Sequence, residues 1–407
     1  MHVVISASSI AVPTLLFGAF DRHNFGDLLF PHIVAALLGD KNFVFAGLAE
    51  RDLRRFGGHR VASLSNLAQQ WREHPVHVIH AGGELLTCDA WQAAVMLLPP
   101  RQAHAAIARF DARPSEGMAW AHRELGISSL APYSVQRNLF PHAKSVMYNA
   151  VGGVELGSSD PALRHEVINN LKAADAVGVR DTLTQNQLRV AGVQTHLLPD
   201  PAVMVAELFG DRILDSSKRG EVAEIMKAFP QGYVAVQFSA DFGDDATLQE
   251  IASQLDQVAL SARCGIVFFR AGAAPWHDDL SCYSRVASRM RSARAMLMSL
   301  NLWDICALIA RSRGYLGSSL HGRIVAMAFA LPRLNMIHPW QTARRTKQGA
   351  FAATWEDAAF PYAVAPSGIA QGMQQALSMD RSMLAHKASE LAGIYRREFA
   401  AICRCMD

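Results

Sequence analysis

The sequence predicts an α/β protein made of two doubly wound, Rossmann-like domains that face each other across a cleft. Short apolar runs that end in polar loops alternate with helical stretches along most of the chain, which is the order expected of mainly parallel sheets covered by helices. The alternation stops at residues 208–221, where charged and small residues replace the apolar pattern, and then starts again. The 407 residues also exceed what one ordinary core accommodates.

These observations divide the chain into parts. We expect a first Rossmann-like domain over residues 1–207, a linker over residues 208–221 and a second Rossmann-like domain over residues 222–379. Residues 380–407 are rich in Ala, Leu, Glu and Arg and have helical periodicity. We expect this terminal helix to pack back across the hinge between the domains.

The composition excludes several classes of protein. A net charge of +3 gives no field that would favour nucleic acid. No Lys or Arg precedes the first apolar residues, which argues against a secretory signal, and no apolar run reaches the roughly 18 residues of a membrane-spanning helix. The six cysteines are scattered, unlike a disulfide framework or a zinc site. We expect a cytoplasmic protein with no metal, and the sequence leaves its oligomeric state open.

The first element is a buried strand over residues 14–20, followed by a polar loop and then a helix up to Leu38. Ligands of open α/β sheets lie beyond the carboxyl ends of the strands, where this loop would lie. Its Asn24 and Asp27 are therefore candidate site residues. A purely structural role for Asp27, as the N-cap of the helix, is the alternative.

Further strands of the first half end in glycines or charged residues. Residues 76–80 form a strand that enters Gly82-Gly83-Glu84, and paired glycines there require positive φ or a close approach to the backbone. A later strand, residues 176–179, ends at Arg180, after which Asp181 or Thr182 begins a helix. Residues 91–130 have a broken periodicity that assigns no element.

The second half repeats the pattern. Residues 232–238 and 265–269 are expected strands, and Arg270 ends the second of them. We expect the loop that carries Asp278 and Asp279 to be solvated. Residues 300–311 are an expected amphipathic helix, and residues 331–337 supply a further strand.

The most informative stretch runs from Tyr315 to Ala326 and predicts a short strand, a small-residue turn and an apolar helix. Ser318 or Ser319 can cap the helix, while Gly322 permits close approach. Free amides at a helix start bind anions, and His321 and Arg323 add donors and charge. The alternative is a turn with a capping His and a surface Arg.

In order, these segments resemble the polysaccharide pyruvyl transferase family. The matching stretches are Asn24-Phe25-Gly26-Asp27, Gly82-Gly83-Glu84-Leu85-Leu86, Val179-Arg180-Asp181, Asp200-Pro201-Ala202 and Ser318-Ser319-Leu320-His321-Gly322. The resemblance implies the arrangement of the GT-B glycosyltransferases, with phosphoenolpyruvate as donor substrate and no other cofactor. The implied acceptor is a sugar of a polysaccharide, or of its lipid-linked repeat unit at the inner face of the membrane. The implied product is a cyclic pyruvate ketal of cell-envelope exopolysaccharide biosynthesis.

The resemblance also implies roles for single residues. His321 is expected to be the general acid or a phosphate clamp. Arg180 is a candidate carboxylate or phosphate ligand, and its alternative is a salt bridge to a neighbouring Asp. Some family members carry Arg where this chain has Ser319, so Arg323 or Arg270 is expected to supply the missing cation.

The remaining candidates are shared between two groups. Backbone or hydroxyl contacts to substrate are expected from Gly82, Gly83, Ser318, Ser319 and Gly322. Acceptor contacts are expected from Asn24, Asp27 and Glu84, and either carboxylate of this set is a candidate base toward the sugar hydroxyl.

Three alternatives remain open at the level of sequence. The first is a nucleotide-sugar-dependent, GT-B-like glycosyltransferase, because fold alone does not fix the donor. The second is a non-catalytic relative that binds or scaffolds. The third is a family member that acts on a small metabolite.

Overall fold

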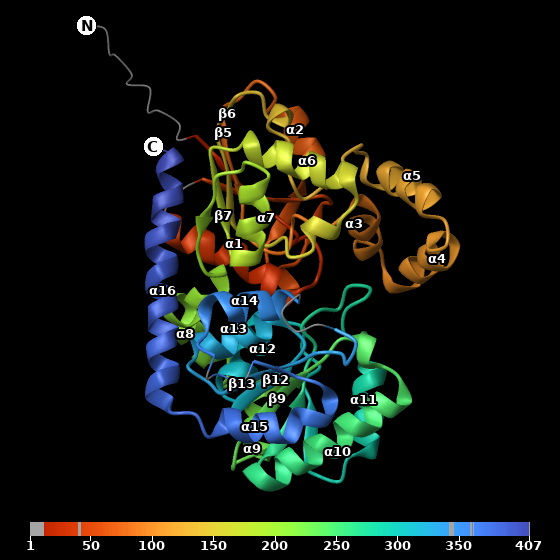
Figure 1. Ribbon diagram of the computed structural model, residues 1–407, viewed down its shortest axis with the longest axis vertical. Helices are drawn as coiled ribbons and strands as arrows, with labels where there is room; N and C mark the ends of the chain where they lie inside the picture. Colours follow the sequence, from red (N-terminus) through yellow and green to blue (C-terminus); the bar gives the residue numbers. More distant parts are fainter. Residues whose placement is uncertain (1–11, 40–41, 342–345, 359, 361, 407) are drawn as a thin grey trace, which may run out of the picture.

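The computed structural model describes residues 12–39, 42–341, 346–358, 360 and 362–406. It consists of two α/β domains stacked along the long axis of the molecule (Figure 1). The strand order of the first sheet is β3-β4-β2-β1-β5-β6-β7-β8, and that of the second is β11-β10-β9-β12-β13-β14. Neighbouring strands are parallel, except that β3 and β4 are antiparallel. The predicted fold class is confirmed.

In the first domain the strands are β1 (Thr14–Phe17), β2 (Phe43–Gly47), β3 (Arg51–Asp52), β4 (Arg60–Ser63), β5 (Val76–His80), β6 (Ala143–Val151), β7 (Ala176–Val179) and β8 (His196–Leu197). Its helices are α1 (Phe25–Leu38), α2 (Leu64–Gln70), α3 (Ala90–Met96), α4 (Pro100–Phe110), α5 (Pro114–Leu125), α6 (Pro161–Lys172) and α7 (Thr182–Val190). The central strand β1 is fully buried, because helices cover both faces of the parallel sheet.

The second domain has the strands β9 (Tyr233–Gln237), β10 (Gly265–Phe268), β11 (Arg294–Met296), β12 (Gly314–Gly317), β13 (Arg333–Met336) and β14 (Ala363–Val364). The helices of the second half are α8 (Val205–Ser216), α9 (Gly220–Ala228), α10 (Asp245–Ala262), α11 (Leu280–Arg289), α12 (Leu302–Ala310), α13 (Leu320–Ala328), α14 (Lys347–Trp355), α15 (Ile369–Leu377) and α16 (Arg381–Cys403). Among the described residues, no helix has the length and apolar character needed to cross a bilayer.

Residues 208–221 lie between the two sheets, as expected, but they do not form a linker. Residues 205–216 form α8, and α9 begins at Gly220, so only a short turn separates two helices. Ile213 of α8 is buried in the core, and α8 packs against α12. The charged residues that suggested a linker lie on the exposed face of an amphipathic helix.

Residues 91–130, unassigned from sequence, form α3, α4 and α5. These helices project from the first domain on the side opposite α16 (Figure 1). Ala90, Ala94 and Ala121 make a small core of their own. Because the helices pack on one another rather than on the sheet, their apolar pattern is interrupted.

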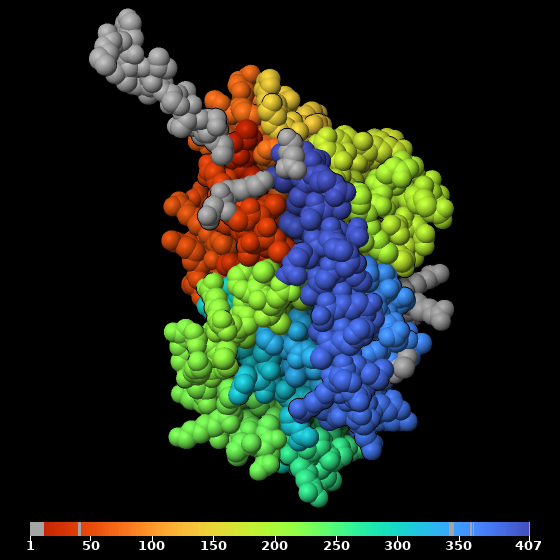
Figure 2. Space-filling model, turned by 90° about the vertical axis from the view of Figure 1, so that its left-hand side faces the viewer, coloured from red at the N-terminus to blue at the C-terminus, as the bar shows by residue number. Residues whose placement is uncertain are grey.

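The terminal helix α16 contacts both domains and runs along one face of the molecule (Figure 2). Its Leu391, Tyr395 and Phe399 are buried. The Tyr395 hydroxyl donates to the side-chain oxygen of Asn149 at the end of β6, over 3.1 Å. A single apolar cluster joins α1, α12, α13 and α16, so the two domains share part of their core.

Candidate active site

The junction of β12 and α13 has the predicted form. Ser319 is the N-cap of α13, and its hydroxyl accepts from the Gly322 amide at 3.2 Å. A Cβ on Gly322 would lie 2.5 Å from the Tyr315 ring, so glycine is required there by packing. Ser318 accepts from the Ser239 amide at 2.9 Å. These contacts hold the turn that presents His321.

A chain of charged groups joins His321 to the first domain. Its Nε2 lies 3.6 Å from Oδ2 of Asp200. The same oxygen accepts from Arg180 Nη1 at 2.9 Å, and Arg180 Nη2 donates to Glu84 Oε2 at 2.5 Å. Two carboxylates thus share one guanidinium, which leaves a negative charge facing the imidazole. Sequence reasoning did not assign a role to Asp200, although it lies in one of the matching stretches.

The charged groups that link His321 to the first domain are buried to different degrees. Asp200 is fully buried and Arg180 is 2% exposed, whereas the Glu84 side chain is 25% exposed. Burial alone would raise the pKa of Asp200, but His321 and Arg180 outweigh it and hold this pKa below its usual value. Arg180 is therefore placed in a buried ion-pair network, the structural alternative considered from sequence. Its role as a substrate ligand stays a prediction.

The Asn24–Asp27 loop lies against His321. A Cβ on Gly26 would fall 2.0 Å from His321 Nδ1, so the α1 backbone and the imidazole are in direct contact. Asn24, rather than Asp27, caps α1, because the Asn24 side chain accepts from the Gly26 amide. Asp27 is buried in the first turn, where its side chain faces Gly83.

The same loop joins the domains through its backbone. The Phe25 amide donates to the Ala271 carbonyl at 2.9 Å, and Asn24 and Gly272 form a β-bridge. Gly82 and Gly83 have φ of +129° and +105°, as the paired glycines led us to expect. Asn24, Asp27 and Glu84, which we expect to contact the acceptor sugar, therefore all lie near the domain boundary.

Arg323 and Arg270, the expected replacement cations, have different surroundings. Arg323 is fully buried and donates to both oxygens of Glu356, at 2.7 and 2.8 Å, while Arg333 donates to Glu356 at 2.9 Å. Burial would raise the pKa of Glu356, but the two arginines lower it to about 2. Arg323 is thus held in a buried ion-pair network within the domain. Arg270 is half-buried, and its Nε has no hydrogen-bond partner among the described residues.

A cavity of about 500 Å³ lies between the domains beside this network. Glu84 and Glu155 line it from the first domain, and Ser318, His338 and Lys347 line it from the second. Within the described ranges, His338 Nδ1 is a buried nitrogen without a hydrogen-bond partner, and so is Nε2 of His277, which also lines the cavity. Such atoms are costly unless a ligand or water satisfies them.

Sequence reasoning missed Lys347, His277 and His338. Burial first, and then the nearby charges of Arg22 and Lys347, lower the pKa of His277 to about 3. Lys347 and Asp241 are the Lys and Asp side chains that the second domain contributes to the cavity wall. The only local signal for Lys347 is Thr346, a readable N-cap immediately before it.

The loop of Asp278 also differs from expectation. Asp278 is not a solvated residue: it accepts from the Gln237 side chain at 2.7 Å and from the Ala271 amide at 2.6 Å. Burial raises its pKa to about 7. Asp279 is the exposed N-cap of α11, in agreement with a solvated position. Asp278 thus fixes the loop that carries His277.

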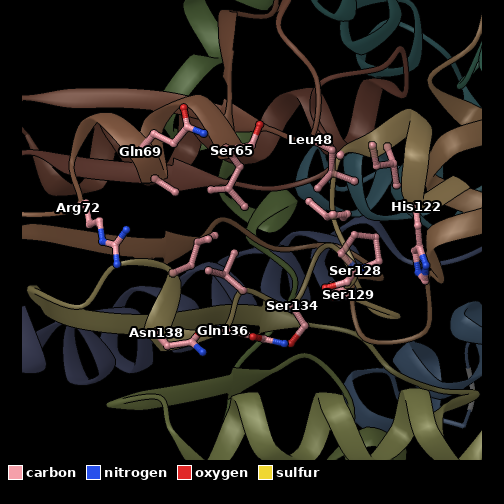
Figure 3. A pocket seen from close by; sticks show the side chains of 18 of the residues that line it. Leu48, Ser65, Gln69, Arg72, His122, Ser128, Ser129, Ser134, Gln136 and Asn138 are labelled. Carbon is pink, nitrogen blue, oxygen red and sulfur yellow. The ribbon is translucent and has the colours of Figure 1, made fainter.

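A separate cavity, of about 770 Å³, lies entirely in the first domain between α2 and residues 126–141. Ser65 and Gln69 of α2 face Ser134 and Gln136 across it (Figure 3). Its residues come from one domain alone, and it includes none of the matching motif residues. We therefore place the candidate site in the cavity between the domains.

Comparison with protein families supports the sequence resemblance. The polysaccharide pyruvyl transferase model matches residues 136–336, a range that contains Arg180, Asp200 and His321. No curated protein matches the chain in sequence.

Solved structures similar to this chain share its fold. The UDP-N-acetylglucosamine 2-epimerase of Rickettsia bellii has a TM-score of 0.56 at 11% identity, with 96% of each chain covered. The UDP-GlcNAc 2-epimerase of Methanocaldococcus jannaschii has 0.52 at 10% identity, covering 91% of this chain and 93% of the other. MnaA of S. aureus has 0.53 at 12% identity, with 95% and 94% covered. At these identities the likeness establishes the GT-B-like arrangement alone.

Proposed function

We propose that this chain, whose residues 136–336 belong to the polysaccharide pyruvyl transferase family, transfers pyruvate from phosphoenolpyruvate to two hydroxyls of a saccharide. The observation that carries the proposal is the cavity between the domains. It adjoins the family motif, and its wall combines Lys347 with nitrogens of His277 and His338 that have no hydrogen-bond partner among the described residues.

The donor would bind through its negative charges. Phosphoenolpyruvate carries a carboxylate and a phosphate, which charged donors bind best. Lys347 is exposed, and within the described part of the chain it has neither a hydrogen bond nor an ion pair. We therefore assign to Lys347 the role of the family arginine that is replaced by Ser319 in this chain. Arg323 is less suited to that role, because it is buried in an ion pair with Glu356.

The reaction would proceed by addition and elimination at C2. A proton enters the methylene carbon C3, and the oxygen of one sugar hydroxyl bonds to C2 while its proton leaves to a base. The C2–O bond to phosphate then breaks, and phosphate departs with the electron pair. A second hydroxyl bonds to C2 and loses its proton, which closes the ketal. One proton is consumed at C3 and two are released.

His321 is our candidate for the acid, because it matches the motif histidine of the family and its Nε2 lies 3.6 Å from the buried carboxylate of Asp200. Glu84 is the candidate base, since it lines the cavity and is the exposed end of the charge chain. His321 is only 9% exposed and contacts Gly26. Contact with substrate therefore requires the α1 loop to move away from His321 during turnover.

The first prediction concerns the donor. Calorimetric titration of the wild-type protein with phosphoenolpyruvate should show saturable binding, weakened at least about tenfold in Lys347→Ala because a charge-assisted contact is lost. Lys227→Ala on α9, an exposed lysine of the same domain, is the matched control and should bind normally. Binding of UDP-GlcNAc without phosphoenolpyruvate would instead identify the nucleotide-sugar glycosyltransferase alternative.

A further inference from the structure

Two exposed tryptophans mark one side of the cavity between the domains. Trp276 and Trp340 line this cavity and are 44% and 72% exposed. Large aromatic surface left in water is unfavourable, so two such rings at one cavity indicate a ligand with a face to cover them. The π face of an indole is negative, and it pairs with the weakly positive C–H face of a sugar ring.

The backbone of Trp276 gives independent support. Its φ is +63°, a left-handed conformation that is a genuine outlier for a bulky residue. Strain of this kind persists when the surroundings enforce it, and it concentrates at binding sites. Here the carbonyl of the next residue, His277, accepts from the Ala240 amide at 3.0 Å, and Asp278 anchors the loop. The strained loop thus presents the indole at the cavity.

The cavity continues beyond the tryptophans. A neighbouring cavity of about 730 Å³ shares Thr87 and Glu155 with it, and extends along α3, α5 and α6. Polar side chains are frequent on its wall. Among them are Gln92, Ser115, His122 and Glu155. Hydroxyl, amide and carboxylate groups in series suit the many hydroxyls of a saccharide chain.

Each of the two cavities lies within the range of about 300–1,000 Å³ that holds a drug-sized ligand. Phosphoenolpyruvate and one sugar ring would occupy the first cavity only. We propose that Trp276 and Trp340 stack on the terminal sugar of an oligosaccharide acceptor, and that the next sugar units follow the second cavity past Glu155 and Ser115. The inference rests on the proposed function, since the saccharide class comes from it.

Two variants separate the ends of this path. Trp276→Gly removes the indole and suits the positive φ, so the fold should be retained. Ser115→Trp places a bulky ring in the second cavity at an exposed position of α5 and leaves the first cavity unchanged. Leu260→Ala removes an exposed apolar side chain far along α10 and is the control.

The test is binding to an array of mono-, di-, tri- and tetrasaccharides that end in galactose, glucose, mannose or N-acetylmannosamine. Wild type and Leu260→Ala should bind tetrasaccharides of at least one series about tenfold more strongly than its monosaccharide. Trp276→Gly should lose binding to saccharides of every length. Ser115→Trp should still bind the monosaccharide but should lose the increase in affinity from monosaccharide to tetrasaccharide. Equal binding of all lengths, no glycan binding by the wild type, or variants that match Leu260→Ala would overturn the inference.

The outcome is independent of the donor. If the wild-type protein does not bind phosphoenolpyruvate in the calorimetric experiment, the proposed function is contradicted but the glycan result still stands. Normal phosphoenolpyruvate binding without a chain-length effect would contradict the oligosaccharide path alone.

Discussion

At the scale of single residues, Gly26 determines how closely the first domain approaches His321. A side chain at this position would meet the imidazole, because a Cβ would lie 2.0 Å from Nδ1 and 2.1 Å from Cγ. The imidazole is also bounded by the Phe30 ring, whose centroid lies 5.2 Å away. Its position is thus fixed by packing on one side and by Asp200 on the other.

We predict that Gly26→Ala displaces His321 and lowers pyruvyl transfer by at least about tenfold, since small misplacements of reacting groups are costly. Gly210→Ala on α8 is the control, because a Cβ there meets nothing within 4 Å. That substitution should stabilise the helix by roughly 0.5–1 kcal/mol and leave activity unchanged. Thermal unfolding and phosphate release measure the two effects, and equal activity of both variants would contradict the contact.

The residue scale also sets the limit of sequence reasoning. The motif residues Arg180 and His321 were found because each adjoins a strand end. Their partners could not be read from sequence, since Glu84 lies 96 positions before Arg180. Glu356, 33 positions after Arg323, was equally invisible, although it explains why that arginine is buried.

At the scale of elements, a cluster of rings joins α1 to α8 and α12. His32 of α1 lies 4.1 Å from the His59 ring and 5.0 Å from that of Trp303, measured between centroids. Arg212 of α8 stacks on Trp303 at 3.9 Å. Burial, and the neighbouring positive charges, lower the pKa of His32 to about 4 and that of His59 to about 3.

This cluster predicts acid sensitivity. The unfolded chain takes up protons near the ordinary histidine pKa of 6.5, whereas the folded protein does so only near pH 3–4. Between these pH values the unfolded state therefore binds more protons than the folded state. The free energy of unfolding should fall as the pH drops from about 6.5 toward 4. Urea unfolding at several pH values measures the slope.

His59→Gln should flatten that slope by about one proton's contribution, and His104→Gln on the exposed face of α4 should not. An unchanged slope in His59→Gln would contradict the assignment of the proton uptake to this cluster.

Helices and strands were predictable where the hydrophobic periodicity and the glycines that mark element ends agree. Residues 76–80 were expected as a strand and are β5 with the same bounds. The helices α3–α5 were missed because they pack on each other. The helix α14 was missed although Thr346 marks its start as an N-cap. The α8 region was mistaken for a linker because its exposed face is charged.

At the scale of the whole molecule, the site exists only because two sheets present their loops to one another. The first domain contributes Glu84, Arg180 and Asp200, and the second contributes His321 and Lys347. The shared apolar cluster and α16 hold the domains together. Movement needed for substrate contact is therefore expected in the loops at the boundary rather than in the core.

The measurement that tests the central claim most directly uses phosphoenolpyruvate labelled with ¹³C at C2. It is incubated with the protein and the oligosaccharide that the array selects, and carbon NMR follows C2. We predict a new ketal carbon together with released phosphate, and a rate about 10²–10⁴-fold lower in His321→Asn, because a positioned acid is lost. A C2 signal that stays in phosphoenolpyruvate while UDP-GlcNAc is consumed would contradict pyruvyl transfer.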